Sequence, residues 1–355
     1  MTPQGLRYHA PRNPHPLPHR ARRDSFGPGV SAIARLVAAA PLLAASLTAF
    51  AQDPAQEYPN RAIRIIVPFT AAGPTDNNAR LVGQKLTEAW GQPVVVENRP
   101  AAGGVPGTEL VAKAAPDGYT LLAANPGPLT IAPSLVPNLP YDSSRDFAPV
   151  ILVTITSSVI ALHPSAPIGS VRELIAYAKA HPGRLNYGSP GVGTVGHLTI
   201  ELFDSLAGIR MTHVPYKGIA PATTDFLAGR LDVLQLSVPT SLPLLRAGRI
   251  KAVGVTGKKR SPLLPDVPTV DEAGLAGFEA FNWNGLFAPA GTPREIVAKL
   301  YNEIARRALS AEMREQLIAQ GFEIAGYGPD EYAAFIRAEI AKWAHVIKTA
   351  GVKAE

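Results

Sequence analysis

The sequence contains no cysteine among its 355 residues. It therefore has no thiol that could form a disulfide, act as a nucleophile, carry a lipid or serve as a soft metal ligand. It also lacks a Gly-x-Ser-x-Gly elbow, and no nucleophile paired with a base stands out, so hydrolase chemistry has no support. Beyond residue 51 no apolar run is long enough to cross a bilayer. We expect a soluble mature chain, held together by its core alone and long enough for two domains.

A basic character is missing from most of the chain, although the formal net charge is +6. Residues 1–51 hold six arginines and one acidic residue, which leaves 28 basic and 27 acidic side chains for the rest. An almost neutral mature chain has no basic surface of the kind that binds nucleic acid, and we expect no nucleic-acid partner.

The first 51 residues have the pattern of a cleaved export signal. Arginines precede an apolar run at 36–51, which closes on Ala49, Phe50 and Ala51, a small-x-small cleavage pattern. A membrane anchor fits less well, because the run has about 16 residues and contains Pro41, whereas a span needs about 20. Two alternatives stay open: Arg22 and Arg23 resemble a twin-arginine signal, and a later start near Val30 would leave an ordinary one.

Strand and helix patterns alternate along the rest of the chain. Short β-branched runs such as 63–67 precede helical patterns, which favours two α/β lobes whose sheets are mostly parallel. The apolar run at 147–164 is too long for one strand and predicts a passage between lobes, and 281–293 predicts the return. The last helices, from Thr292 onward, are expected on the first lobe. Two lobes joined by two crossings enclose a cleft, the usual place for a small ligand.

The stretch SPGVGTVGHL at 189–198 contains Gly191, Gly193 and Gly196 in the GxGxxG spacing of a dinucleotide-binding turn. Such a site also needs an acidic residue at the end of the next strand, but that strand ends in Tyr216 and Lys217. A nicotinamide cofactor is therefore not expected. A glycine turn before a helix still presents N–H groups and a dipole that attract an anion. A tight turn without a ligand is the alternative.

A second turn of the same design follows the first strand, at 68–76. It passes through Gly73 into a helix for which Thr75 or Asp76 is expected as the N-cap, and which Gly91 should end. Two such turns, one on each lobe, would face each other across the cleft.

Other polar residues give weaker signals. The histidines His163, His181, His197, His213 and His345 show no metal-ligand spacing, so no metal site is expected. Lys217 either attracts an anion or is a solvated loop residue, and Trp283 either walls the cleft or packs at the crossing.

Seven stretches in order along the chain carry a family resemblance: YPNRAIRIIVPFTAAGPTDNNAR, GQPVVVENRPAAGG, AKAAPDGYTLL, LNYGSPGVGT, HVPYKGIAPATTD, SPLLPDVPTVDEAG and LFAPAGTP. Over almost all of the mature chain the sequence resembles the Bug-type solute receptors, the extracytoplasmic binding proteins of tripartite tricarboxylate transporters. The resemblance implies an α/β type II periplasmic-binding-protein fold with a central ligand cleft. The expected divisions are a signal at 1–51, a linker at 52–59, lobe 1 at 60–157 with 281–355, and lobe 2 at 158–280.

The resemblance also implies that the first loop grips a carboxylate through backbone groups and water, and that the second turn and the loops near Asn125 and Ser237 shape the rest of the pocket. The expected ligand-binding residues are Phe69, Thr70, Ala72, Gly73, Thr75, Asp76, Asn125, Ser189, Gly191, Gly193, Thr194, Val195, His197, Tyr216 and Ser237. The chain departs from the family in two places. A single Gly73 stands between Ala72 and Pro74 where two glycines are common, and Leu236-Ser237 replaces a frequent Asp-Asn, which predicts a more apolar wall.

The patterns and the resemblance together lead us to expect a periplasmic receptor with no catalytic residue, cofactor or metal, and the resemblance implies that it captures a small organic carboxylate and delivers it to a tripartite transporter. Two alternatives remain. An exported enzyme would need a titratable group poised in the cleft. A partner of a sensor kinase ectodomain would share the fold and differ only in what docks outside.

Overall fold

The structure is a computed structural model, and it describes residues 57–353. The predicted export signal and most of the predicted linker lie outside the described residues. The described part begins in the core, because Tyr58 is 3% exposed and its ring packs edge-on against Trp90 and Tyr119.

The first lobe is built on a six-stranded mixed sheet in the order β11-β4-β10-β3-β1-β2. Its strand β1 pairs in parallel with β2 and β3, whereas β10 runs antiparallel to β3 and β4, and β11 antiparallel to β4. The strands are β1 (Ile63–Val67), β2 (Val94–Asn98), β3 (Thr120–Ala124), β4 (Phe147–Thr156), β10 (Asn282–Pro289) and β11 (Glu323–Tyr327).

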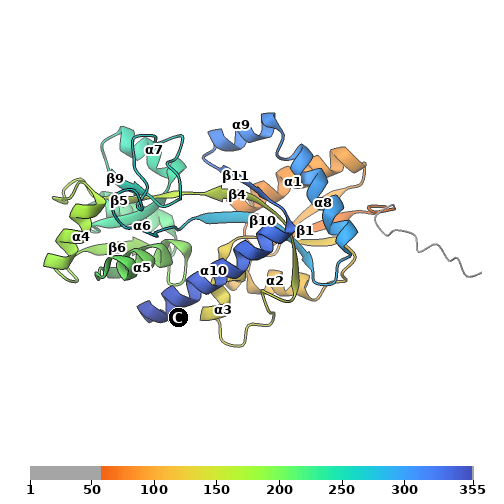
Figure 1. The fold of residues 1–355 in the computed structure, drawn as a ribbon, viewed down its shortest axis with the longest axis horizontal. Coiled ribbons are helices and arrows are strands. Elements are labelled where there is room, and N and C mark those ends of the chain that lie inside the picture. Colours follow the sequence, from red (N-terminus) through yellow and green to blue (C-terminus); the bar gives the residue numbers. More distant parts are fainter. Residues whose placement is uncertain (1–56, 354–355) are drawn as a thin grey trace, which may run out of the picture. The chain divides into compact units, whose positions relative to one another are not determined.

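The second lobe is built on a five-stranded sheet in the order β7-β6-β8-β5-β9. Here β6 pairs in parallel with β7 and β8, and β5 runs antiparallel to both of its neighbours. The strands are β5 (Ser158–Leu162), β6 (Asn186–Ser189), β7 (Thr212–Pro215), β8 (Val233–Ser237) and β9 (Lys251–Val255). Figure 1 shows these strands at the left and those of the first sheet at the right.

The expectation of mostly parallel sheets is wrong. The strands that carry the chain between the lobes, β4, β5 and β10, all lie in the middle of their sheets and pair antiparallel. Consecutive parallel strands need a crossover connection between them, usually a helix. A chain that passes straight from one sheet to the other has no such connection, so its strands run antiparallel to their neighbours. The two predicted crossings themselves are present. β4 ends at Thr156 and β5 begins at Ser158 in the other sheet, and β10 begins at Asn282. The strand membership of the sheets supports the predicted lobe boundaries, which remain our proposal.

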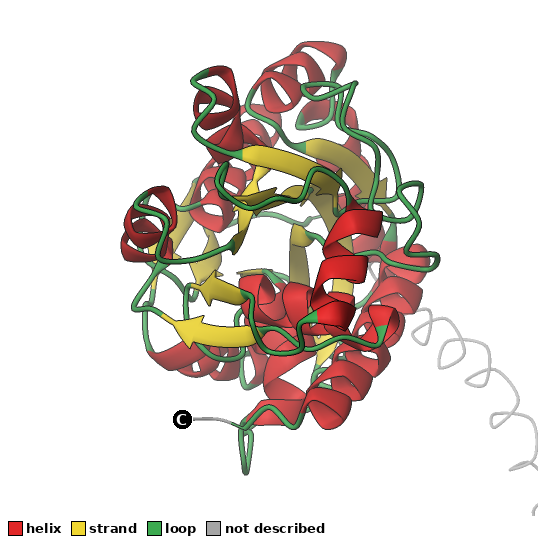
Figure 2. Ribbon diagram, turned by 90° about the vertical axis from the view of Figure 1, so that its left-hand side faces the viewer, coloured by secondary structure: helices red, strands yellow, loops and turns green. Residues whose placement is uncertain are grey.

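Helices cover the outer faces of both sheets (Figure 2). On the first lobe they are α1 (Pro74–Trp90), α2 (Val105–Ala112), α3 (Ala132–Leu135), α8 (Arg294–Arg307), α9 (Ala311–Ala319) and α10 (Pro329–Ala350), with short turns at Ala102–Gly104 and Gly127–Ile131. On the second lobe they are α4 (Val171–Ala180), α5 (Val195–Ala207), α6 (Ile219–Leu227) and α7 (Val238–Arg246). Within residues 57–353 no helix has the length and apolarity that a membrane span requires.

The start of α1 differs from the sequence prediction. Its N-cap is Gly73 and Pro74 is the first helical residue, so Thr75 and Asp76 lie inside the helix. Proline suits this position, because it needs no N–H there and its φ is already helical. The predicted end is confirmed: Gly91 adopts a left-handed φ of 67°, and its N–H bonds the carbonyl of Thr87.

The last helix, α10, packs into the cores of both lobes. Its first half buries Tyr332 and Ile336 in a cluster with Trp283 and Phe287 of β10. Its second half buries Trp343, Val346 and Ile347 in the cluster that contains Leu198 and other residues of α5. Figure 1 shows the C-terminal end of α10 beside α5. This helix therefore connects the two lobes in addition to the two strand crossings.

Asp204, near the end of α5, has a carboxyl group that is buried in the protein. It is 6% exposed; its Oδ2 accepts the N–H of Met211 at 2.6 Å, and its Oδ1 has no partner. Burial is the main cause that raises its pKa to about 7. Because the folded chain holds this proton more tightly than the unfolded chain does, the free energy of unfolding falls as pH rises from about 4 to about 7.

We expect Asp204→Asn, which mimics the protonated acid, to raise the free energy of unfolding above pH 7 by up to about 4 kcal/mol. At pH 4 the variant and the wild type should unfold at the same denaturant concentration. Urea titrations at the two pH values measure this. A variant equally destabilised at both would show that Asp204 is ionised and satisfied in the folded chain.

Candidate functional site

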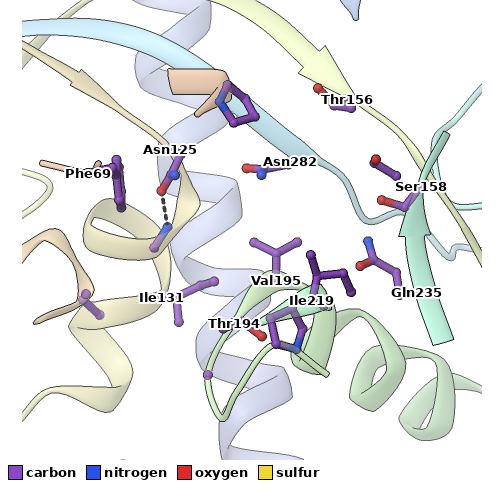
Figure 3. A pocket seen from close by; sticks show the side chains of 18 of the residues that line it. Phe69, Asn125, Ile131, Thr156, Ser158, Thr194, Val195, Ile219, Gln235 and Asn282 are labelled. Atoms are coloured by element: carbon purple, nitrogen blue, oxygen red, sulfur yellow. Dashed lines mark hydrogen bonds between the residues drawn. The ribbon is translucent and has the colours of Figure 1, made fainter. Parts of the chain in front are cut away.

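A cavity of about 1080 Å³ lies between the two sheets. Both lobes contribute to its wall, as do the two crossings, through Thr156, Ser158 and Asn282. In Figure 3, Phe69, Asn125 and Ile131 of the first lobe face Ser158 and Gln235 across the cavity. The predicted cleft between the lobes is therefore present.

Five helices begin at the cavity wall. The first residues of α1, α2, α5 and α6, and the second residue of α7, all line it. These residues are Pro74, Val105, Val195, Ile219 and Pro239. The N-terminus of a helix carries unsatisfied N–H groups and about half a positive charge from the helix dipole. The dipoles of five helices therefore favour negative charge at one place.

Among the described residues that line the cavity, none has a charged side chain. The polar lining consists of amides and hydroxyls, such as Asn125, Gln235 and Asn282, and the apolar lining includes Ile131, Val195 and Ile219. Ile219 is 39% exposed. The site therefore offers uncharged hydrogen-bonding groups beside an apolar surface. No group of three metal-ligating side chains occurs within residues 57–353.

The structure brings six of the fifteen predicted ligand-binding residues to the cavity wall: Phe69, Asn125, Gly193, Thr194, Val195 and Ser237. The other nine do not line this cavity: Thr70, Ala72, Gly73, Thr75, Asp76, Ser189, Gly191, His197 and Tyr216. A ligand contact at any of the fifteen stays a prediction. Several of the nine have structural partners that account for their burial.

Asp76 supports the first loop from behind. Its carboxylate accepts the N–H of Ala72 at 2.9 Å, and it also accepts hydrogen bonds from Arg80 and Asn98. Burial opposes ionisation, but these three donors hold the pKa of Asp76 below its ordinary value. The bond to Ala72 matters because this residue has a φ of 67°, a left-handed conformation that costs a non-glycine residue about 1 kcal/mol. Ala72 thus takes a conformation that glycine adopts more readily.

Thr75 positions a residue that does line the cavity. Its hydroxyl donates to Oδ1 of Asn284 on β10 at 2.8 Å and accepts a longer bond, 3.4 Å, from Nδ2 of Asn125. Oδ1 of Asn125 accepts the N–H of Gly127 at 3.1 Å, as the dashed line in Figure 3 shows. The Asn125 side chain is therefore held from both ends.

The second turn, at 189–197, is also held from behind. The carbonyl of Gly191 accepts the hydroxyls of Ser189 and Thr194, at 3.1 and 2.7 Å. The N–H of Gly193 donates to Nδ1 of His197 at 3.1 Å. The Gly193 N–H therefore has an acceptor within the protein, and a ligand contact at this turn stays a prediction. Tyr216 is engaged elsewhere, with its hydroxyl on Asp225.

Sequence reasoning missed the lining residues on the crossings and on β8, namely Thr156, Ser158, Gln235 and Asn282. A signal was present: TITSS and NWN place polar residues within strands that are otherwise apolar. Leu236 lines the cavity, but it is 1% exposed and packs in the core with Val159 and Phe226, so its side chain does little to make the wall apolar.

Two α/β lobes around a cleft at which helices begin define the class of two-lobed periplasmic binding proteins. Two solved structures from Rhodopseudomonas palustris have the same fold. One, solved with adipate, is 39% identical, covers 84% of this chain and 99% of its own, and superposes with a TM-score of 0.71. The other, MatC with bound malate, is 35% identical, covers 82% and 100%, and has a TM-score of 0.67.

The family model described as the tripartite tricarboxylate transporter family receptor, TctC, matches residues 78–352. The protein BugT of Bordetella pertussis is 37% identical over 320 residues, which cover 90% of this chain and 98% of BugT. The chain belongs to the TctC family of periplasmic solute-binding receptors. The predicted Bug-type resemblance and the predicted fold are both confirmed.

We expect Asp76→Ala to lower the free energy of unfolding by about 2–4 kcal/mol at pH 7, because three donors lose a charged acceptor. The pKa of Asp76 is lowered in the folded chain, so its contribution is present at neutral pH and is lost as pH falls below about 4. Denaturant titrations at pH 7 and pH 3 measure both effects. Glu88→Ala removes an exposed ion pair on the same helix and should change little. Equal losses in the two variants would contradict the role given to Asp76.

Proposed function

We propose that this protein is a periplasmic receptor that closes its two lobes around a small organic carboxylate and delivers it to the membrane subunits of a tripartite transporter. In this proposal the N-terminal signal is removed on export. The receptor makes and breaks no bond, and closure is stabilised by contacts of the ligand with both lobes.

The observation that carries the proposal is the convergence of five helix N-termini on a cavity whose described lining has no charged side chain. A carboxylate that leaves water needs hydrogen-bond donors and a positive potential. Helix N-termini supply both without a counter-ion. A cationic ligand would meet five dipoles of the wrong sign.

The relatives agree with a carboxylate ligand. One solved relative is described with adipate and another with malate, both of which are dicarboxylates. An exported enzyme acting on the same class of molecule would place a titratable acid or base at the cavity, and the described lining residues include none. A sensor partner would bind the ligand in the same way, so binding assays alone do not separate it from a transport receptor.

The two glycines Gly193 and Gly208 allow a matched test of the second turn. Both have a left-handed φ, 72° and 61°, but a Cβ on Gly193 would lie 2.5 Å from Cδ1 of Leu135 across the cavity, whereas one on Gly208 would meet nothing within 4 Å. We expect Gly193→Leu to weaken ligand binding at least tenfold, and Gly208→Leu to bind as the wild type does. Both variants should lose about 1 kcal/mol or more of stability from backbone strain. Calorimetric titration with adipate measures the affinities. Unchanged binding in Gly193→Leu would remove this turn from the site.

The apolar part of the lining predicts a preference for longer ligands. Each methylene buried contributes about 0.8 kcal/mol, so we expect adipate to bind on the order of tenfold more tightly than succinate, which has two fewer. Titrations of the chain from Gln52 with succinate, glutarate, adipate and malate test this. Tightest binding of malate would show that the polar amides, and not Ile131, Val195 and Ile219, dominate recognition.

A further inference from the structure

Two histidines that are 16 residues apart in the sequence stack behind the second turn. The rings of His197 on α5 and His213 on β7 have centroids 3.9 Å apart and an angle of 11° between their planes. The ring of Tyr187 on β6 is stacked with both, its centroid 4.8 Å from that of His213 and 6.2 Å from that of His197. His197 is 4% exposed. None of these three rings lines the cavity.

Each ring of the histidine pair is bonded to the turn. Nδ1 of His197 accepts the N–H of Gly193 at 3.1 Å. Nε2 of His213 lies 2.6 Å from the hydroxyl of Ser189, which bonds the carbonyl and the N–H of Gly191. The turn between these two anchors includes Gly193, Thr194 and Val195, which do line the cavity.

The bond to Gly193 fixes the protonation of His197. A backbone N–H donates only to a ring nitrogen that carries no proton, so Nδ1 must be bare and the ring proton must be on Nε2. Nε2 lies 3.5 Å from Oε1 of Glu201, one helical turn further on. The same oxygen accepts the hydroxyl of Tyr187, so Glu201 is oriented by two partners.

The nearby carboxylate of Glu201 favours a proton on His213, whereas burial and the second ring oppose it. The titratable groups that surround His197 are Glu201 and, further along α5, Asp204; Tyr187 on β6; and His213 on β7. The strand β8 contributes the neutral Gln235 near Gly196, and α10 meets α5 through Trp343, Val346 and Ile347. Burial, and then the neighbouring His197, lower the pKa of His213 to about 4, so this ring stays neutral over the range in which a receptor works. Two cationic rings in stacking contact would repel each other strongly.

We propose that His197 is a positioning residue: its unprotonated Nδ1 accepts the Gly193 N–H and so holds the turn at 189–197 in the geometry that captures the ligand. Tyr187, Glu201 and His213 keep the ring in the orientation that this bond requires. The effect on capture rests on the proposed function, whereas the effect on the turn does not.

The turn itself is tested in the ligand-free protein by NMR. We expect the Gly193 amide proton to resonate downfield and exchange slowly in the wild type, and to shift upfield and exchange faster in His197→Phe, which keeps a ring but has no acceptor. His197→Asn keeps an acceptor at the place of Nδ1, so its Gly193 amide should stay close to that of the wild type. His345→Asn, which changes an exposed histidine on α10, should behave as the wild type. A Gly193 amide that exchanges as slowly in His197→Phe as in the wild type overturns the proposal.

Ligand capture is tested with adipate as the probe at pH 7.5. We expect His197→Phe to bind about tenfold more weakly than the wild type, because one hydrogen bond is lost. His197→Asn, which restores an acceptor for the Gly193 N–H, should bind adipate about as tightly as the wild type.

The two failures are distinct. If adipate, succinate and malate do not bind the wild type at all, the proposed function fails, and the Gly193 amide still decides the role of His197. If adipate binds the wild type and His197→Phe with the same affinity, His197 does not control capture, and the proposal is overturned.

Discussion

The structure depends on a chain that passes from one sheet to the other with a single residue between two strands. That residue is Ser157, between β4 and β5. Its hydroxyl donates to Glu323 of β11 in the first lobe, and its carbonyl accepts the N–H of Val238, the first residue of α7 in the second. The return passage is tied to the same point, because Thr256 bonds both Ser158 and Ala280. With so little chain between them, the two sheets must meet end to end.

From this constraint follows the chemistry of the cleft. Strands that end at the meeting point turn there into helices, so the beginnings of those helices are collected around one cavity. The chain can then offer an anion a favourable environment without placing a lysine or arginine in the wall. Uncharged walls have a kinetic advantage for a receptor, since a ligand held by a buried ion pair is slow to leave.

The sequence predicted the parts of this arrangement that depend on local pattern, and it missed those that depend on what the chain packs against. The glycine turns, the strand patterns and the polar residues of the family motifs located both loops. Gly193 lines the cavity as expected. Asp76 and His197 lie in the first turns of the helices that follow those loops and do not line the cavity, and no spacing rule tells which side of a turn a side chain will take. Asn282 and Ser158 belong to the crossing strands. In these strands the partner sheet determines which side chains face the core and which face the cleft. His197 and His213 meet only because β6 lies beside β7.

The helix α10 gives the molecule a third mechanical link. At 22 residues it is about 33 Å long, and its two halves are embedded in different cores. Two adjacent strands alone would let the lobes twist about each other as well as bend. Because α10 packs on that strand pair and is anchored in both cores, it would resist twisting and leave bending at the crossings as the easier motion. In the proposed transport function, a docking protein could then distinguish the empty and loaded forms by one displacement.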